Sequence, residues 1–168
     1  MTSVFVRLHC LHSRRNPMPY YNFTKDLPVA KATEVETAGI LTKVYKAEIL
    51  DYEDTNAYDI LARINDALVT FEVKEDFLCE FTGNVGLEFE CRGKPSGIQT
   101  SQADYYIYKL HTNHGIEFVM FKTSTLKTMI DERRYFRVVN GGDKGSNSMN
   151  YLFKYDIFVR AGRIIPIS

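Results

Sequence analysis

Leu68-Val69-Thr70-Phe71-Glu72-Val73-Lys74 is the stretch of sequence that sets the predicted architecture of this chain. Apolar Phe71 and Val73 alternate with polar Thr70, Glu72 and Lys74, which is the period of two expected of a β-strand with one buried face. Because side chains at positions i and i+2 share a face of a strand, Glu72 and Lys74 are predicted to project from one surface.

The preceding residues 57–64 are predicted to form an antiparallel partner strand. The two strands are joined at Asn65-Asp66, residue types that tolerate the positive φ angles of a tight hairpin. If these two residues form the loop, paired residue numbers sum to 131. Asp59 then lies opposite Glu72, with Cβ atoms about 4.5–5.5 Å apart.

Two carboxylates placed face to face repel each other, so this pairing predicts a compensating cation. Mg²⁺ is typically held by one or two carboxylates together with substrate phosphate. Lys74 on the same face could neutralise phosphate charge or position an attacking water. The hairpin therefore predicts a site for Mg²⁺, or for Mn²⁺ in its place, that acts on a phosphate group.

Asp59, followed on the next predicted strand by Glu72-Val73-Lys74, resembles the core motif of the PD-(D/E)XK nuclease superfamily. No proline precedes Asp59, which departs from a common feature of that superfamily. Further resemblance to small phage-encoded members lies in three downstream blocks, Thr82 to Ile98, Ala103 to Ile107 and Val139 to Asp143.

The resemblance implies an α/β fold with a restriction-endonuclease-like core, in which a mixed central sheet of about five strands is flanked by α-helices. It places the nuclease-like domain at residues 26–168, after an N-terminal extension at 1–25. The implied function is a Mg²⁺-dependent DNA endonuclease, phage-type and site-specific in the manner of a homing enzyme. The alternatives are a branch-specific nuclease resembling Holliday-junction resolvases, or a non-catalytic nucleic-acid-binding or structural protein with the same fold.

Within this interpretation Asp59, Glu72 and the backbone oxygen of Val73 are the expected metal ligands, and Lys74 is the expected catalytic amine. Residues 30–50 show an amphipathic helical pattern, with Thr33 as a candidate cap. In the resembled family a helix before the core often supplies one more glutamate. Glu34 is the candidate, with Glu36 as the alternative, although an acid in a first helical turn also simply suits the helix dipole.

Candidate DNA contacts are the basic and polar residues of two loops, of the end of a helix and of a short helical turn. Basic side chains and glycine-rich backbone suit a phosphodiester backbone, although such segments are also ordinary turns or helix C-termini. The eight candidates are Arg92, Lys94, Ser96, Gln99, Arg133, Arg134, Asn140 and Lys144.

The remaining elements are expected to be strands at 85–91, 105–110 and 116–121. Glu88 and Glu90 are expected to face solvent, with the cleft beside Glu72 as the alternative. His111 is expected in a hairpin turn. A helix is expected to be capped by Thr123 or Ser124, and residues 151–165 are expected to be strand-like.

Composition restricts the partners. Lys and Arg number 21, as do Asp and Glu, so DNA binding requires the two signs to be segregated on the surface. Three cysteines without a CxxC motif favour a reduced compartment, here the cytoplasm of a bacterial or phage-infected cell. No apolar run approaches 18 residues, so no membrane span is expected. A duplex has two strands to cut, so we expect a homodimer.

Overall fold

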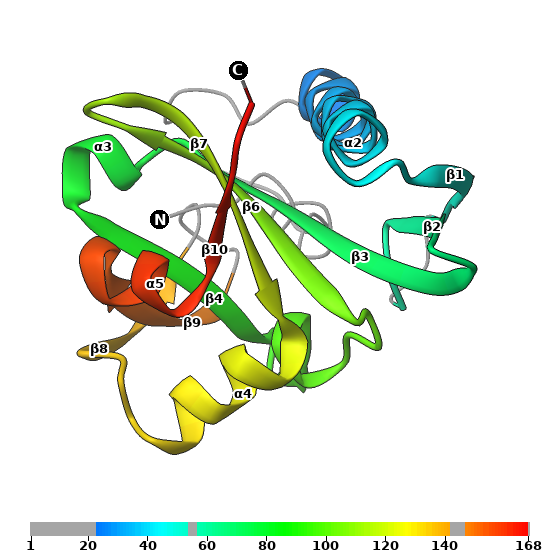
Figure 1. The fold of residues 1–168 in the computed structure, drawn as a ribbon. Coiled ribbons are helices and arrows are strands. Elements are labelled where there is room, and N and C mark those ends of the chain that lie inside the picture. Colours follow the sequence, from blue (N-terminus) through cyan, green and yellow to red (C-terminus); the bar gives the residue numbers. More distant parts are fainter. Residues whose placement is uncertain (1–22, 54–56, 142–146, 168) are drawn as a thin grey trace.

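The computed structural model describes residues 23–53, 57–141 and 147–167. Over these ranges the chain is a mixed α/β structure with a six-stranded sheet, a second four-stranded sheet and four α-helices (Figure 1). In Figure 1 helix α2 lies on one side of the larger sheet, whereas α4, α5 and the smaller sheet lie on the other.

The larger sheet has the strand order β1-β2-β3-β6-β7-β10. Its β3 and β6 strands run parallel to each other, and the other neighbouring pairs are antiparallel. Its strands are β1 (Glu48–Tyr52), β2 (Ile60–Ile64), β3 (Ala67–Asp76), β6 (Tyr105–Thr112), β7 (Gly115–Lys122) and β10 (Arg163–Ile165).

The smaller sheet has the order β5-β4-β9-β8 and is antiparallel throughout. Its strands are β4 (Asn84–Cys91), β5 (Lys94–Pro95), β8 (Arg137–Gly141) and β9 (Ser148–Lys154). The helical elements are α2 (Phe23–Tyr45), α3 (Cys79–Thr82), the 3-10 turn η1 (Gly97–Gln99), α4 (Thr123–Asp131) and α5 (Tyr155–Ala161).

The predicted β2–β3 hairpin is confirmed with its register. Ile60 pairs with Phe71 and Ile64 with Ala67, so paired numbers sum to 131. Asn65 and Asp66 have φ angles of 49° and 64°. Two consecutive positive φ angles match the right-handed twist of the flanking strands, which is why the Asn-Asp pair forms this turn.

Several sequence predictions are corrected. The larger sheet has six strands rather than about five, and the strand predicted at 85–91 belongs to the smaller sheet. The helix expected over 30–50 ends at Tyr45, because Lys46 adopts a φ of 57° and leads into β1. Residues 151–165 include helix α5 as well as strand.

The expected helix caps are also corrected. Thr33 lies inside α2, not at its start. The cap position of α4 is Lys122, whose side chain makes no cap bond. Thr123 instead donates its hydroxyl to the Ala103 carbonyl at 2.5 Å.

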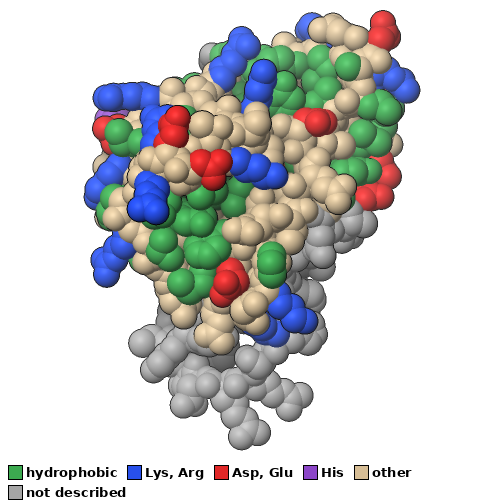
Figure 2. Space-filling view, turned by 90° about the horizontal axis from the view of Figure 1, so that it is seen from below, with side chains coloured by type: hydrophobic (Ala, Val, Ile, Leu, Met, Phe, Trp, Pro, Cys, Tyr) green, Lys and Arg blue, Asp and Glu red, His purple; other side chains and the backbone are tan. Residues whose placement is uncertain are grey.

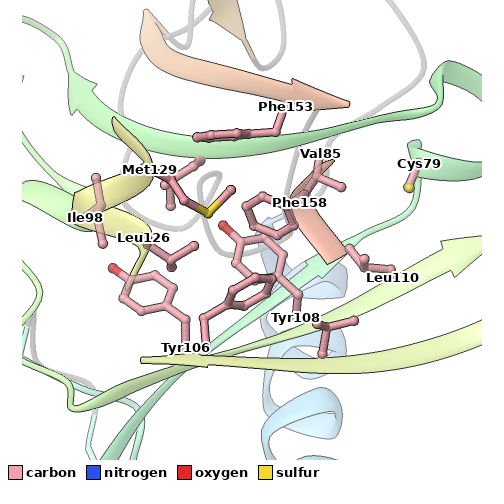
Figure 3. Close-up of a cluster of buried hydrophobic side chains, with 13 residues drawn as sticks. Cys79, Val85, Ile98, Tyr106, Tyr108, Leu110, Leu126, Met129, Phe153 and Phe158 are labelled. Carbon is pink, nitrogen blue, oxygen red and sulfur yellow. The ribbon is translucent and has the colours of Figure 1, made fainter. Parts of the chain in front are cut away.

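Two buried cores lie on opposite faces of the larger sheet. We call the first the helix-facing core; it joins α2 to residues of β2, β3 and β6 such as Phe71, Val73 and Ile107. We call the second the inner core; it fills the space between the two sheets and includes Tyr106, Tyr108 and Phe158 (Figure 3). The alternation along β6 explains the division, since Ile107 faces α2 while Tyr106 and Tyr108 face the smaller sheet.

Candidate functional site

Asp59 directly precedes β2, at the point beyond which β3 is paired only with β6. Its backbone N–H donates to the Phe71 carbonyl at 2.8 Å, which extends the hairpin ladder by one residue. Its carboxylate Oδ2 then accepts a hydrogen bond from the backbone N–H of Val73 at 2.7 Å. The side chain of Asp59 is therefore held at the edge of β3, next to Glu72.

Glu72 and Lys74 project together from β3, as the period of two predicts. The ammonium Nζ of Lys74 lies 2.5 Å from Oε1 of Glu72, and the two side chains are only 3% and 4% exposed. A buried ion pair of this kind loses hydration on both partners, so its net stabilisation is small, whereas removal of one partner is costly.

The pKa of Asp59 is raised well above its usual value. The largest cause is burial, and the second is the nearby Glu72 carboxylate; Lys74 and the Val73 N–H act in the opposite direction. Glu34 raises the pKa of Asp59 further. The two carboxylates therefore lie in one electrostatic environment, in which negative charge is only partly compensated.

Glu34 reaches the same environment from helix α2, whereas Glu36 does not. Glu34 is buried, and its carboxylate lies 3.3 Å from Nζ of Lys31 one turn earlier. Glu36 is largely exposed and pairs with Lys109 of β6 at 2.6 Å. The structure therefore separates the two candidates that the sequence left open, and it favours Glu34. We refer to Glu34, Asp59, Glu72 and Lys74 together as the Asp59 cluster.

The donor set of the Asp59 cluster suits a hard cation, although no preformed cage is present. Within the described ranges, no three His, Cys, Asp or Glu side chains are arranged to hold a metal ion. The carboxylates of Asp59 and Glu72 are nonetheless oxygen donors with surplus negative charge, and Mg²⁺ needs only one or two protein carboxylates. The Val73 N–H points to Asp59, and its carbonyl points to the same edge because both groups of a strand residue do so. The residues present therefore fit a magnesium ion that completes its coordination with water and phosphate.

Access to the Asp59 cluster is closed in this structure. Each of its four residues is at most 5% exposed. A phosphate group therefore reaches the carboxylates only after neighbouring segments have moved, as happens in a minority of complexes on binding.

Glu88 of β4 was expected to face solvent, and this expectation is wrong. Its side chain is buried and accepts hydrogen bonds from the hydroxyls of Ser96 at 2.7 Å and Ser148 at 2.9 Å. The face of β4 that carries Glu88 is covered, since its cross-strand partner Asn150 and, on the same face of β9, Ser148 are also buried. Ser96, a predicted DNA contact, thus uses its hydroxyl inside the protein.

The other predicted DNA contacts lie on different elements and do not form one surface patch defined by a single loop. Arg92 and Lys94 are exposed at the β4–β5 turn, and Gln99 is exposed in η1. Asn140 lies near the end of β8 that pairs with the start of β9, whereas Arg133 and Arg134 are exposed before the opposite end of β8. Lys144 lies outside the described residues.

On the face shown in Figure 2, Lys and Arg side chains are spread over several places and interspersed with Asp and Glu, around an apolar area. On this face the positive and negative side chains are therefore not segregated, as they would have to be on a surface that binds DNA.

Gly97 holds the loop that carries Ser96 against β4. It has a φ of 52°, and a Cβ there would lie 2.3 Å from the backbone oxygen of Glu88. Gly93 in the same loop has a φ of 72° but open space around it. We expect Gly93→Ala to cost about 1–2 kcal/mol for the backbone conformation alone, and Gly97→Ala to cost about 1–3 kcal/mol more. Urea denaturation of the two variants measures the difference, and equal losses would contradict the close approach.

Glu75 forms a second buried polar cluster on the opposite face of β3. Its Oε2 accepts a hydrogen bond from the Thr33 hydroxyl, and its Oε1 lies 2.8 Å from Nε2 of His111 and 3.3 Å from Nζ of Lys109. His111 is therefore a half-buried residue of β6, not part of a surface turn as expected. These contacts join α2, β3 and β6, and Thr33 directly precedes Glu34.

We expect Glu75→Ala to lower the free energy of unfolding by about 1–3 kcal/mol, because it leaves buried donors unsatisfied. Glu36→Ala is the matched control, since Glu36 pairs with the same Lys109 but from an exposed position. Its cost should be no more than about 1 kcal/mol. Chemical denaturation measures both values; a loss no larger for Glu75→Ala than for the control would show that the buried contacts contribute little.

Comparison with protein-family models and with curated proteins gave no match for this chain. Any function therefore has to be argued from the Asp59 cluster and its surroundings.

Two sequence expectations outside the cluster can also be compared with the structure. Among the helices that the structure describes, none combines the length and the apolar character needed to cross a membrane. Cys79 is a buried free thiol, but Cys91 is disulfide-bonded, so the expectation of reduced cysteines is wrong for Cys91.

Proposed function

We propose that this chain is a metal-dependent DNA endonuclease of the PD-(D/E)XK type, which hydrolyses phosphodiester bonds with Mg²⁺ or Mn²⁺. The observation that carries the proposal is the convergence of Asp59, Glu72 and Lys74 at the edge of β3, with Glu34 adding to the same negative field. The resemblance of the sequence motifs to small phage-encoded nucleases supports it, and a restriction-endonuclease-like core is part of the proposal.

Asp59, Glu72 and the carbonyl of Val73 would hold the metal ion. When bound, the ion lowers the pKa of a coordinated water and polarises the scissile phosphate. The Val73 N–H holds Asp59 in place for this task through its 2.7 Å hydrogen bond. The repulsion that raises the pKa of Asp59 in the free protein is relieved by the added positive charge.

Lys74 would stabilise the charge that develops on the phosphate. In the structure its ammonium is held by Glu72, so it stays close to the place where the phosphate would lie. With Glu72 engaged as a metal ligand, Lys74 would be available to donate to a phosphate oxygen. Glu34, one helical turn from Lys31, would accept a hydrogen bond from the attacking water and orient it.

The mode of DNA recognition is proposed from the exposed basic residues. Arg92, Lys94, Arg133 and Arg134 would contact phosphates and fix the position of the duplex. A site-specific, homing-like enzyme acting as a homodimer is the form we propose, because one cluster per chain cuts one strand. The proposed location is the cytoplasm of a bacterial or phage-infected cell, where the DNA substrate lies, although a disulfide such as that of Cys91 is uncommon in that compartment.

The test is incubation of the purified full chain with supercoiled plasmid and, separately, with a four-way DNA junction, each with Mg²⁺ and with EDTA. We expect Mg²⁺-dependent nicking or linearisation of the plasmid, and its loss in Glu72→Gln. Cleavage of the junction alone would indicate a resolvase-like enzyme. If neither substrate is cut with Mg²⁺ or Mn²⁺, the chain is a non-catalytic protein and the proposal is wrong.

A further inference from the structure

Tyr106 and Tyr108 on β6 have similar surroundings but differ in the hydrogen bonding of their hydroxyls. Tyr106 and Tyr108 are both buried in the inner core, and their rings stack at 6.4 Å between centroids. The Tyr108 hydroxyl donates to the Gly86 carbonyl at 3.1 Å. The Tyr106 hydroxyl makes no hydrogen bond of standard geometry within the part of the chain that the structure describes, although the Ser101 hydroxyl lies close enough to affect its pKa. Figure 3 shows the two side chains running side by side, with the Tyr106 hydroxyl on the side of Ile98 and Leu126.

Tyr106 lies beside the Asp59 cluster, although it belongs to the inner core. The parallel register of β3 and β6 pairs it with Glu72, so the two side chains leave neighbouring strands on the same face. Nζ of Lys74 lies 6.0 Å from the centroid of the Tyr106 ring. The tyrosine thus borders the Glu72–Lys74 ion pair from the side of β6.

A phenol is protonated at neutral pH, so the Tyr106 hydroxyl is a donor without any special surroundings. Burial, and after it the Glu72 carboxylate, raise the pKa of Tyr106 well above its usual value, while hydrogen bonding with the Ser101 hydroxyl lowers it. The residue of β3 that pairs with Tyr106 is Glu72, and its charged carboxylate oxygens are strong acceptors. A fully buried donor without a hydrogen bond of standard geometry destabilises the free protein, and such groups call for an explanation.

We propose that Tyr106 is a positioning residue for Glu72: its hydroxyl donates to the Glu72 carboxylate when Lys74 leaves that carboxylate for a phosphate oxygen. The proposal rests on the proposed nuclease function. In the free protein Nζ of Lys74 contacts Oε1 of Glu72 at 2.5 Å, and the Tyr106 hydroxyl makes no hydrogen bond to this carboxylate. Once the ammonium has moved, the phenol fixes the carboxylate in the orientation needed to bind a metal ion, as groups behind metal ligands commonly do.

The test compares Tyr106→Phe with Tyr108→Phe, because each removes one hydroxyl from the same strand and the same core. With plasmid DNA under single-turnover conditions, we expect Tyr106→Phe to cleave about 10- to 100-fold more slowly and to need more Mg²⁺ for half-maximal rate. Tyr108→Phe should keep the rate and the Mg²⁺ dependence of the wild type.

A second readout needs neither DNA nor metal. In EDTA, Tyr108→Phe should lower Tm by about 2–4 °C, since it leaves the Gly86 carbonyl without its donor. Tyr106→Phe should leave Tm unchanged or raise it, since it removes a buried hydroxyl that makes no hydrogen bond of standard geometry. A purely structural role for Tyr106 would lower Tm as Tyr108→Phe does.

Two failures can be told apart. If the wild type cuts DNA and Tyr106→Phe cuts at the same rate with the same Mg²⁺ dependence, the role assigned to Tyr106 is wrong and the nuclease proposal stands. If the wild type cuts no DNA, the nuclease proposal is wrong and the role of Tyr106 is withdrawn with it. A drop in Tm for Tyr106→Phe equal to that of the control would also overturn the assignment.

Discussion

Lys74→Met should reduce the rate of Mg²⁺-dependent DNA cleavage by about 10²–10³-fold, the usual effect of removing one group that stabilises charge in the transition state. Methionine preserves most of the length of the side chain and removes the charge. The ammonium of Lys74 is the cation nearest to Glu72 in the described structure, at 2.5 Å. Its loss therefore affects both the developing phosphate charge and the carboxylate that binds the metal.

The same substitution should destabilise the protein. Two further variants, Glu72→Gln and the double variant, serve as controls for the size of this effect. Lys74→Met leaves the buried Glu72 carboxylate unpaired, which typically costs about 3–5 kcal/mol. Glu72→Gln should cost less, because Lys74 then still has the Asp59 carboxylate in its field. The double variant Glu72→Gln/Lys74→Met carries neither charge and should be more stable than Lys74→Met alone.

Cleavage and urea denaturation of the three proteins measure these expectations. The double variant separates loss of catalysis from loss of folding, since it should be folded and inactive. Cleavage at the wild-type rate by a folded Lys74→Met protein would remove Lys74 from the mechanism. Equal stability of all three variants would show that the Glu72–Lys74 pair is not buried in solution.

Asp59→Asn should abolish metal-dependent cleavage and at the same time stabilise the metal-free protein at neutral pH. The amide oxygen of asparagine can still accept the hydrogen bond from the Val73 N–H. The substitution removes the charge that burial and Glu72 disfavour, and for which the pKa of Asp59 is raised. Each kcal/mol gained should raise Tm by about 2–4 °C in a chain of this size.

The raised pKa of Asp59 determines how the stability of the wild type changes with pH. The unfolded chain releases the Asp59 proton near the ordinary pKa of 3.8, whereas the folded protein retains it to higher pH. Between these two values the folded state binds more protons, so the stability of the wild type falls as pH rises and then levels off above the folded pKa. Asparagine does not titrate, so the advantage of Asp59→Asn should grow across that interval.

Thermal unfolding in EDTA from pH 4 upward measures the effect, with wild type and Asp59→Asn side by side. Added Mg²⁺ should raise the Tm of the wild type, because a ligand that binds only the folded state stabilises it, and should raise that of Asp59→Asn less. A variant that is less stable than the wild type at neutral pH would contradict the electrostatic description of the cluster.

The part of the site that the sequence predicted is the part built by local structure. Asn65-Asp66 fixes a two-residue turn, the turn fixes the register, and the register brings Asp59 to Glu72. Lys74 follows from the period of two on the same strand. No long-range information is needed for any of these steps, because loop length sets the pairing in a hairpin.

The contacts that the sequence missed depend on distant segments. Glu72 and Tyr106 pair in the parallel β3–β6 ladder, whose strands are separated in sequence by α3, β4, β5 and η1. The residue pattern of neither strand specifies the other as its neighbour. Glu88 is buried because Ser96 and Ser148, from other segments of the chain, contact its carboxylate. The choice between Glu34 and Glu36 was set by how α2 packs on the sheet, which helical periodicity alone does not determine.

The most direct measurement of the central claim is a titration of plasmid cleavage with Mg²⁺, for the wild type and for Asp59→Asn and Glu72→Gln, with Glu36→Ala as a control outside the cluster. The account predicts Mg²⁺-dependent cleavage by the wild type and Glu36→Ala, and none by the two cluster variants. Cleavage by folded Asp59→Asn or Glu72→Gln with the Mg²⁺ dependence of the wild type would show that the two carboxylates do not form the metal site.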